Sequence, residues 1–178
     1  MSINHPMITL YSRAIDNITN QEIEGLQIVN RNSNFNFGKI NGISGGESPV
    51  IIEFDIWNNE SNIFAGISVP SAADATNCRF TVWDDANCTS SVNVQDPQTY
   101  TPYVRARCIS QEKNDFQPIA GVRYLPAEKI FGTVSSTPGL LSGQSGGDHI
   151  KIQTKIVIPQ YHVPSFKNFV FEFSYDYI

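Results

Sequence analysis

The sequence predicts an all-β fold, an antiparallel β-sandwich of about eight strands with long polar loops. Residues 50–57 and 150–158 change side-chain character at every second position, with one wholly or mainly apolar face, as a half-buried strand requires. Gly, Pro and Asn separate these and other short apolar runs, and no segment keeps the 3.6-residue period of a helix. Short strands spaced in this way are typical of a sandwich or barrel.

The first 48 residues are expected to form an N-terminal arm or outer strands, and residues 49–178 the sandwich domain. Residues 7–11 and 26–29 are short strand candidates, and Phe35 with Phe37 marks a possible return to the sheet. Because arms of this kind are commonly exchanged between subunits, the 1–48 segment is a candidate assembly element.

The stretch from Val50 to Trp57 is expected to be the central strand. One face is wholly apolar and the opposite one mixes charge with large hydrophobes, as Val50, Ile52, Phe54 and Ile56 alternate with Ile51, Glu53, Asp55 and Trp57. The mixed face indicates that another part of the protein partly covers it. We expect the neighbouring strand at residues 78–84, with Cys78 and Phe80 facing inward.

The second half of the chain supplies the remaining strands. Residues 103–109 place Val104, Ala106 and Cys108 on an inward face, opposite Tyr103, Arg105 and Arg107. Residues 116–124 are weakly strand-like, because Pro118 and Gly121 interrupt them. Residues 150–158 form the clearest strand after the first. The chain finishes on an aromatic row, Phe169, Phe171, Phe173 and Tyr175, which predicts that the C-terminus packs into the core.

Composition narrows the classes of partner. Only 16% of the 178 residues are charged, against about a quarter in a typical soluble domain. The net charge is −5 and the basic residues are scattered, so we expect no nucleic-acid partner. No apolar run is long enough to span a membrane, so we expect no membrane partner. The first residues lack the pattern of a signal peptide, which predicts synthesis in the cytosol.

For each group of residues that could bind a metal or act in catalysis, a purely structural role is the favoured interpretation. Asp55, Asp74, Asp84 and Asp85 are a hypothetical calcium site, but aspartates that cap turns are the favoured reading. Cys78, Cys88 and Cys108 with His149 or His162 match no zinc spacing, and small buried side chains are favoured. Cys88, His149 and Asp148 can be written as a nucleophilic set, although no motif frames them. The glycine-rich residues 143–148 lack the end of a phosphate loop. The sequence therefore predicts no catalytic residues, no metal and no cofactor.

Five aromatic residues are expected to face outward, where they can form an interface or stack on a sugar ring. They are Trp57, Trp83, Tyr100, Tyr103 and Tyr161. Aromatic side chains beside charge on a sheet face are commonly interfaces, so the interface interpretation is favoured.

Several strings of residues 50–177 resemble small structural proteins of tailed bacteriophages and of related particles. They are Phe54–Asn59, Cys78–Trp83, Pro102–Arg107, Gly147–His149, Ile152–Pro159 and Phe171–Tyr177. The resemblance implies a non-enzymatic β-sandwich of the virion, in the tail, baseplate or a capsid accessory position. It implies self-association and contacts with other virion proteins after synthesis in the host bacterial cytoplasm. The alternative is a carbohydrate- or receptor-binding module that recognises a glycan on the host cell surface.

Overall fold

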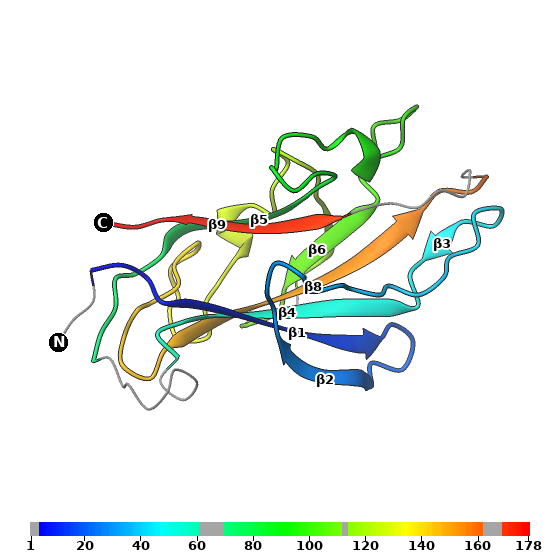
Figure 1. Ribbon diagram of the computed structural model, residues 1–178. Helices are drawn as coiled ribbons and strands as arrows, with labels where there is room; N and C mark the ends of the chain where they lie inside the picture. The colour runs from blue at the N-terminus through cyan, green and yellow to red at the C-terminus, as the bar shows by residue number, and fades with distance from the viewer. Residues whose placement is uncertain (1–3, 61–69, 112–113, 162–168) are drawn as a thin grey trace.

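The computed structural model describes residues 4–60, 70–111, 114–161 and 169–178, and it is an antiparallel β-sandwich (Figure 1). The described residues form no α-helix, and two single turns of 3-10 helix, η1 (Val92–Val94) and η2 (Ala127–Lys129), interrupt the loops. The strands are β1 (Ile8–Asp16), β2 (Glu22–Ile28), β3 (Gly46–Glu47), β4 (Val50–Asn58), β5 (Thr76–Trp83), β6 (Val104–Cys108), β7 (Gln117–Pro118), β8 (Asp148–Ile158) and β9 (Val170–Asp176). The predicted fold class is confirmed.

Two sheets of unequal size make the two layers. The large sheet has the order β2-β1-β4-β8-β6-β7, with β3 also paired to β8, and the small sheet consists of β5 and β9. All the pairings are antiparallel. The expectation that residues 78–84 lie beside β4 is wrong, because β4 pairs with β1 and β8 while β5 lies in the opposite sheet. Residues far apart in sequence thus outcompete the next strand along the chain.

The core lies between the two sheets, and Phe54 is near its centre. Its ring centroid is 5.0 Å from that of Phe35, 5.4 Å from that of Phe80 and 5.1 Å from that of Phe171. Aromatic rings at these spacings add edge and stacking attractions to the burial of apolar area. The inward faces predicted for β4, β5 and β6 are confirmed, and the aromatic row of β9 packs against the core.

Residues 8–28 form the two strands at one edge of the large sheet. β1 pairs with β4 over nine register positions, from Ile8 opposite Asn58 to Asp16 opposite Val50. Tyr11, Ala14 and Ile15 of β1 are buried. The segment that follows β2 returns to the sandwich, where Phe35 and Phe37 contact Phe171.

In the small sheet, loop residues pair with the edge of β5 that faces away from β9. Gly121 and Leu125 donate backbone hydrogen bonds of 2.8 and 2.7 Å to carbonyl groups of β5, and Leu141 donates one of 2.8 Å to Ala75, just before that strand. Loop residues therefore border the small sheet, whereas the large sheet has a polar outer face.

Candidate functional site

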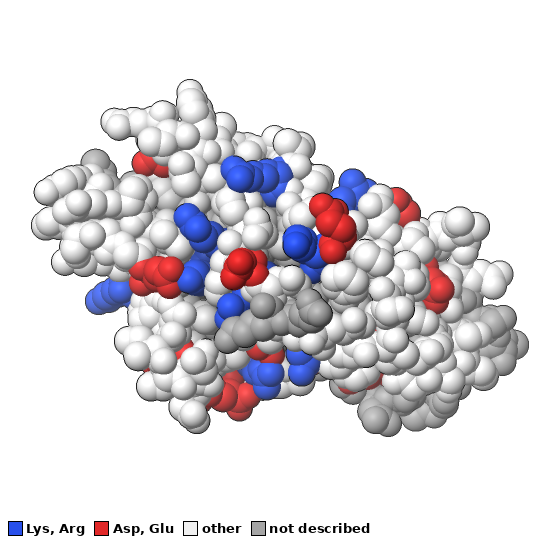
Figure 2. All heavy atoms as spheres, turned by 180° about the vertical axis from the view of Figure 1, so that it is seen from behind, with Lys and Arg blue, Asp and Glu red and all other residues white. Residues whose placement is uncertain are grey.

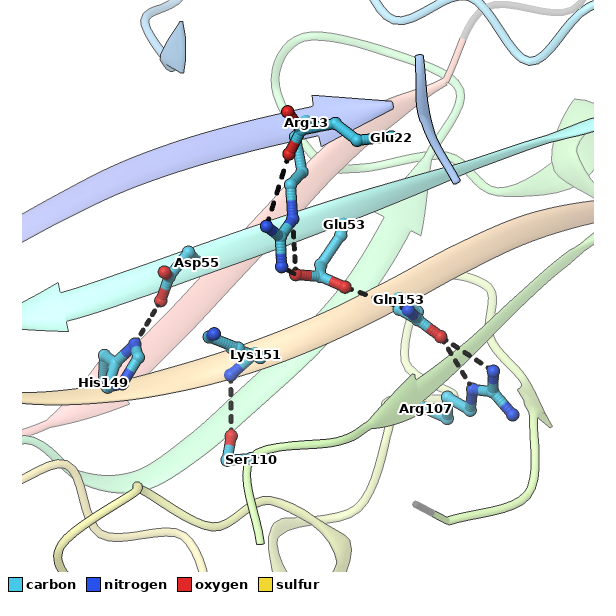
Figure 3. Close-up of polar contacts among 9 residues, drawn as sticks. All are labelled: Arg13, Glu22, Glu53, Asp55, Arg107, Ser110, His149, Lys151 and Gln153. Atoms are coloured by element: carbon cyan, nitrogen blue, oxygen red, sulfur yellow. Dashed lines mark hydrogen bonds and ion pairs between the residues drawn. The ribbon is translucent and has the colours of Figure 1, made fainter. Parts of the chain in front are cut away.

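The outer face of the large sheet carries a row of polar residues that the strand register aligns. Arg13 of β1 lies opposite Glu53 of β4, which lies opposite Gln153 of β8, which lies opposite Arg107 of β6. Directly paired residues of antiparallel strands point to the same face. Four strands that are distant in sequence therefore place these side chains side by side, as Figure 3 shows.

Hydrogen bonds join the row from end to end (Figure 3). Arg13 donates to Glu53 Oε1 from Nε at 2.8 Å and also from Nη2. Gln153 Nε2 donates to Glu53 Oε2 at 2.9 Å, and Gln153 Oε1 accepts from Arg107 Nε at 3.0 Å and Nη2 at 2.8 Å. Glu53 is only 2% exposed. Its charge is stabilised by Arg13 and by the amide, so it stays buried without an unmet bond.

The far end of the row is closed by an aromatic ring. The guanidinium of Arg107 lies 4.1 Å from the ring centroid of Phe116, and Lys155 Nζ lies 4.4 Å from it. Lys155 also donates to Glu47 at 2.6 Å, and this hydrogen bond lowers the pKa of Glu47. Burial lowers the pKa of Arg107. The Lys155 ammonium group is therefore paired with a carboxylate of the same chain.

A second cluster on the same face comes from β4 and β8. The rings of Trp57 and His149 are stacked with centroids 4.0 Å apart and an interplanar angle of 18°. His149 Nδ1 and Asp55 Oδ1 are 2.6 Å apart (Figure 3). A carboxylate that orients an imidazole supplies two of the three members of a hydrolytic triad. Within the described ranges, no hydroxyl or thiol is hydrogen-bonded to the His149 ring.

The five aromatic candidates do not converge. Tyr100 and Tyr161 lie on loops and are 70% and 76% exposed, while Trp57 is partly buried in its stack.

All five were expected to face outward, and for two of them the structure corrects this. Tyr103 is 1% exposed and Trp83 is 8% exposed. The backbone N–H of Tyr103 donates to Val94 in the 84–102 loop, which places the residue under the loop layer. The Trp83 ring lies against Gly121, and its Nε1 donates to Glu172 at 2.6 Å. Neither ring is accessible to a sugar.

The four aspartates of the hypothetical calcium site hold separate parts of the chain. Asp74 accepts from the Gly143 backbone at 2.8 Å, Asp84 from that of Asn93 at 2.7 Å, and Asp85 from that of Ser90 at 2.6 Å. The turn-capping interpretation fits Asp85 and, across a longer loop, Asp84, but not Asp74, whose partner is 69 residues away. It does not fit Asp55, which is buried in mid-strand beside His149. Across the described residues, no group of three or more His, Cys, Asp or Glu is placed to hold a metal ion.

The surroundings of the cysteines and of the glycine-rich loop indicate structural roles for them. All three thiols are free, and Cys78 and Cys108 are buried as expected. His162 lies outside the described residues. Asp148 of the hypothetical nucleophilic set accepts backbone hydrogen bonds from Val134, Ser142 and His149. Asp74 takes the N–H of Gly143, so that group is not available to a phosphate.

The strand β2 begins earlier than the short strand expected at residues 26–29, and the sequence pattern did not single out its first half. It lies at the end of the large sheet, only β1 pairs with it among the described strands, and all seven of its residues are exposed. Ile23, Leu26 and Ile28 are each more than half exposed. Figure 1 shows β2 at the lower margin of the sheet. Alternation of Glu with Ile at residues 22–24 is the sequence signal that could have suggested a strand here.

The charges on the surface are mixed in sign. Figure 2 shows acidic and basic side chains interspersed across the middle of the rear face, with largely uncharged surface toward both ends. A strong single-sign field for steering a ligand is absent from that view. The described part of the chain contains no helix long and apolar enough to cross a lipid bilayer.

Comparison with known proteins adds no relative. The chain matches no protein-family model, no curated protein and no solved structure.

Proposed function

We propose that this protein is a non-enzymatic structural component of a virion, in the tail, baseplate or a capsid accessory position. It acts through contacts with other copies of itself and with other virion proteins. The low charge content and the resemblance of residues 50–177 to small phage structural proteins support this assignment. The lack of a nucleophile at His149 in the described residues also favours a role without catalysis.

The observation that carries the proposal is the β2 edge patch, which consists of Ile18, Ile23, Leu26 and Ile28. All four side chains are large, aliphatic and more than half exposed, and three of them belong to a strand whose outer edge pairs with no other described strand. Several exposed apolar side chains within one short segment indicate a protein interface more often than single ones do. A free edge adds a row of backbone groups ready to pair with another chain. The patch therefore fits a subunit contact.

The first test is the solution mass of the purified protein, measured by light scattering behind a sizing column. We expect a defined multiple of 19.8 kDa. Deleting the first 20 residues is a poor probe, because Tyr11, Ala14 and Ile15 belong to the core. The virion assignment is tested by density-gradient sedimentation of particles from a bacterium that makes the protein. Recovery of the chain only in the soluble fractions would contradict it.

A glycan-binding module is the second candidate, favoured by the exposure of Tyr100 and Tyr161. Their rings stand free on loops, where a sugar could stack on either of them. Binding to purified host cell walls should then fall on Tyr100→Ala or Tyr161→Ala. Tyr177→Ala, which removes another exposed ring, is the matched control. Absence of binding by the unsubstituted protein would eliminate this candidate.

A further inference from the structure

The strand β2 gains little from its own chain. Its backbone pairs on one side with β1, and the pairing contains irregular steps between Ser12 and Ile15. Its sequence contains neither Lys nor Pro, and its only charges, Glu22 and Glu24, lie in the first half, so the second half carries none of the residues that commonly protect an edge. A strand with every residue exposed lacks the burial that normally orders it.

The core-side face of β2 is also incompletely filled. A pocket of about 160 Å³ that is partly open to solvent lies between β2, β1 and residues 33–36, with Ile28, Phe35 and Ile52 among its lining residues. Side chains that line such a pocket have no protein atoms packed against them on that side. Neither the outer edge nor the inner face of β2 is therefore stabilised as a typical strand is.

The charges along β2 indicate what kind of strand could pair with its outer edge. Glu22 and Glu24 lie in the first half of the strand, the second half is uncharged, and the exposed Arg31 follows three residues after its end. A second copy placed antiparallel brings the acidic start of one strand toward the basic end of the other. Parallel pairing in register would place Glu22 and Glu24 opposite their own counterparts, which is destabilising. The edge is thus self-complementary only in the antiparallel sense.

We propose that two copies of this chain join through antiparallel pairing of their β2 strands, which makes one continuous sheet across the dimer. A two-fold axis normal to the sheet requires one residue to lie opposite itself. With Leu26 at the centre, Glu24 lies opposite Ile28 and Glu22 opposite Asn30. With Gly25 at the centre, Glu24 lies opposite Leu26 and Glu22 opposite Ile28. Neither register opposes like charges. This inference rests on the proposed function, because it names the partner in the subunit contact.

The test is disulfide crosslinking of the full chain carrying Cys88→Ser, which leaves only the buried thiols Cys78 and Cys108. Leu26→Cys and Gly25→Cys are introduced singly and oxidised. Residues directly opposite in an antiparallel pair have Cα atoms about 4.5–5.5 Å apart, within the range for a disulfide. We expect a covalent dimer from at least one of them. Val122→Cys, on an exposed loop, is the matched control and should remain monomeric on denaturing gels.

A second measurement separates this inference from the proposed function. Leu26→Lys with Ile28→Lys should reduce the mass of the native protein to that of a smaller species, whereas Val92→Lys with Val122→Lys should not. An oligomer that keeps its mass in the β2 variant and gives no crosslink overturns β2 pairing, yet it leaves a structural role through another surface. A wild-type protein that is monomeric up to its solubility limit overturns the pairing and the self-association together. If the lysine variant does not fold, the crosslinking decides.

Discussion

Replacing Glu53 by Gln tests the polar row on the large sheet. The substitution keeps the shape of the side chain and removes its charge. Gln153 cannot adapt, because its Oε1 already accepts two hydrogen bonds from Arg107 and its Nε2 must therefore point toward residue 53. The new amide has one oxygen to share between Arg13 and Gln153, and its own N–H groups face donors. At least one buried hydrogen bond is lost.

The size of the effect follows from burial. A hydrogen bond to a charged group contributes about 1.5–3 kcal/mol. The ion pair with Arg13 adds at most about 1 kcal/mol, because the Arg13 side chain is 31% exposed. The substitution also removes the free-energy cost of burying a carboxylate, and this gain offsets part of the loss. We expect Glu53→Gln to lower the free energy of unfolding by about 2 kcal/mol.

The matched control is Glu22→Gln, which removes the other carboxylate bound by Arg13. The Glu22 side chain is 51% exposed and its contact is 3.4 Å long, whereas that of Glu53 is 3% exposed. An exposed ion pair of this kind contributes at most about 0.5 kcal/mol. Urea unfolding should show the midpoint of Glu53→Gln lower by about 1 M, with an unchanged slope, and that of Glu22→Gln nearly unchanged. Equal small shifts for both variants would refute the argument that burial makes the row stabilising.

Three further predictions concern thiols, acid stability and packing. Burial raises the pKa of Cys78 to about 12, and Cys108 is also buried, so a thiol reagent in mildly alkaline buffer should label only Cys88 in the native protein and all three in urea. Labelling of Cys78 or Cys108 before unfolding would contradict this. The pKa of Asp16 is lowered from its usual 3.8 because its carboxylate accepts hydrogen bonds from Thr19 and from the backbone of Ile18. The resulting stabilisation is complete above pH 3.8 and is lost as the pH falls through the lower folded-state value, so Asp16→Asn should flatten the acid limb of a stability–pH curve. Gly132→Ala would place a methyl group 2.1 Å from Asp148 Oδ2 and should cost at least about 2 kcal/mol in urea unfolding, whereas Gly25→Ala, whose nearest contact is at 3.6 Å, should cost little.

Local alternation was enough to locate most strands but not their partners. The runs at residues 50–57, 78–84, 103–109 and 150–158 are strands in the structure. Residues 116–124 retain only the two-residue strand β7. The pairing of β4 with β8 joins residues about 100 positions apart, such as Glu53 and Gln153. No sequence feature near Glu53 predicts that Gln153 is its neighbour.

The sequence also could not predict which of the aromatic candidates are exposed to solvent. Alternation places Tyr103 on the same side as Arg105, yet Tyr103 is buried because the 84–102 loop passes over it. Trp83 is buried against Gly121 and hydrogen-bonded to Glu172, each from a distant segment. A period of two tells which residues share a side of a strand, but what covers that side depends on the path of other segments.

The sequence by itself determined that this chain is all-β, which faces of its main strands are apolar, and that Cys78 and Cys108 are buried. These properties follow from the period of two in the backbone and from the transfer of apolar side chains out of water, both of which act locally. Only the tertiary structure decided that Arg13, Glu53, Gln153 and Arg107 form one row and that β2 has no outer neighbour among the described strands. Strand order and register arise from contacts between distant segments, whose energies depend on which partner each strand finds.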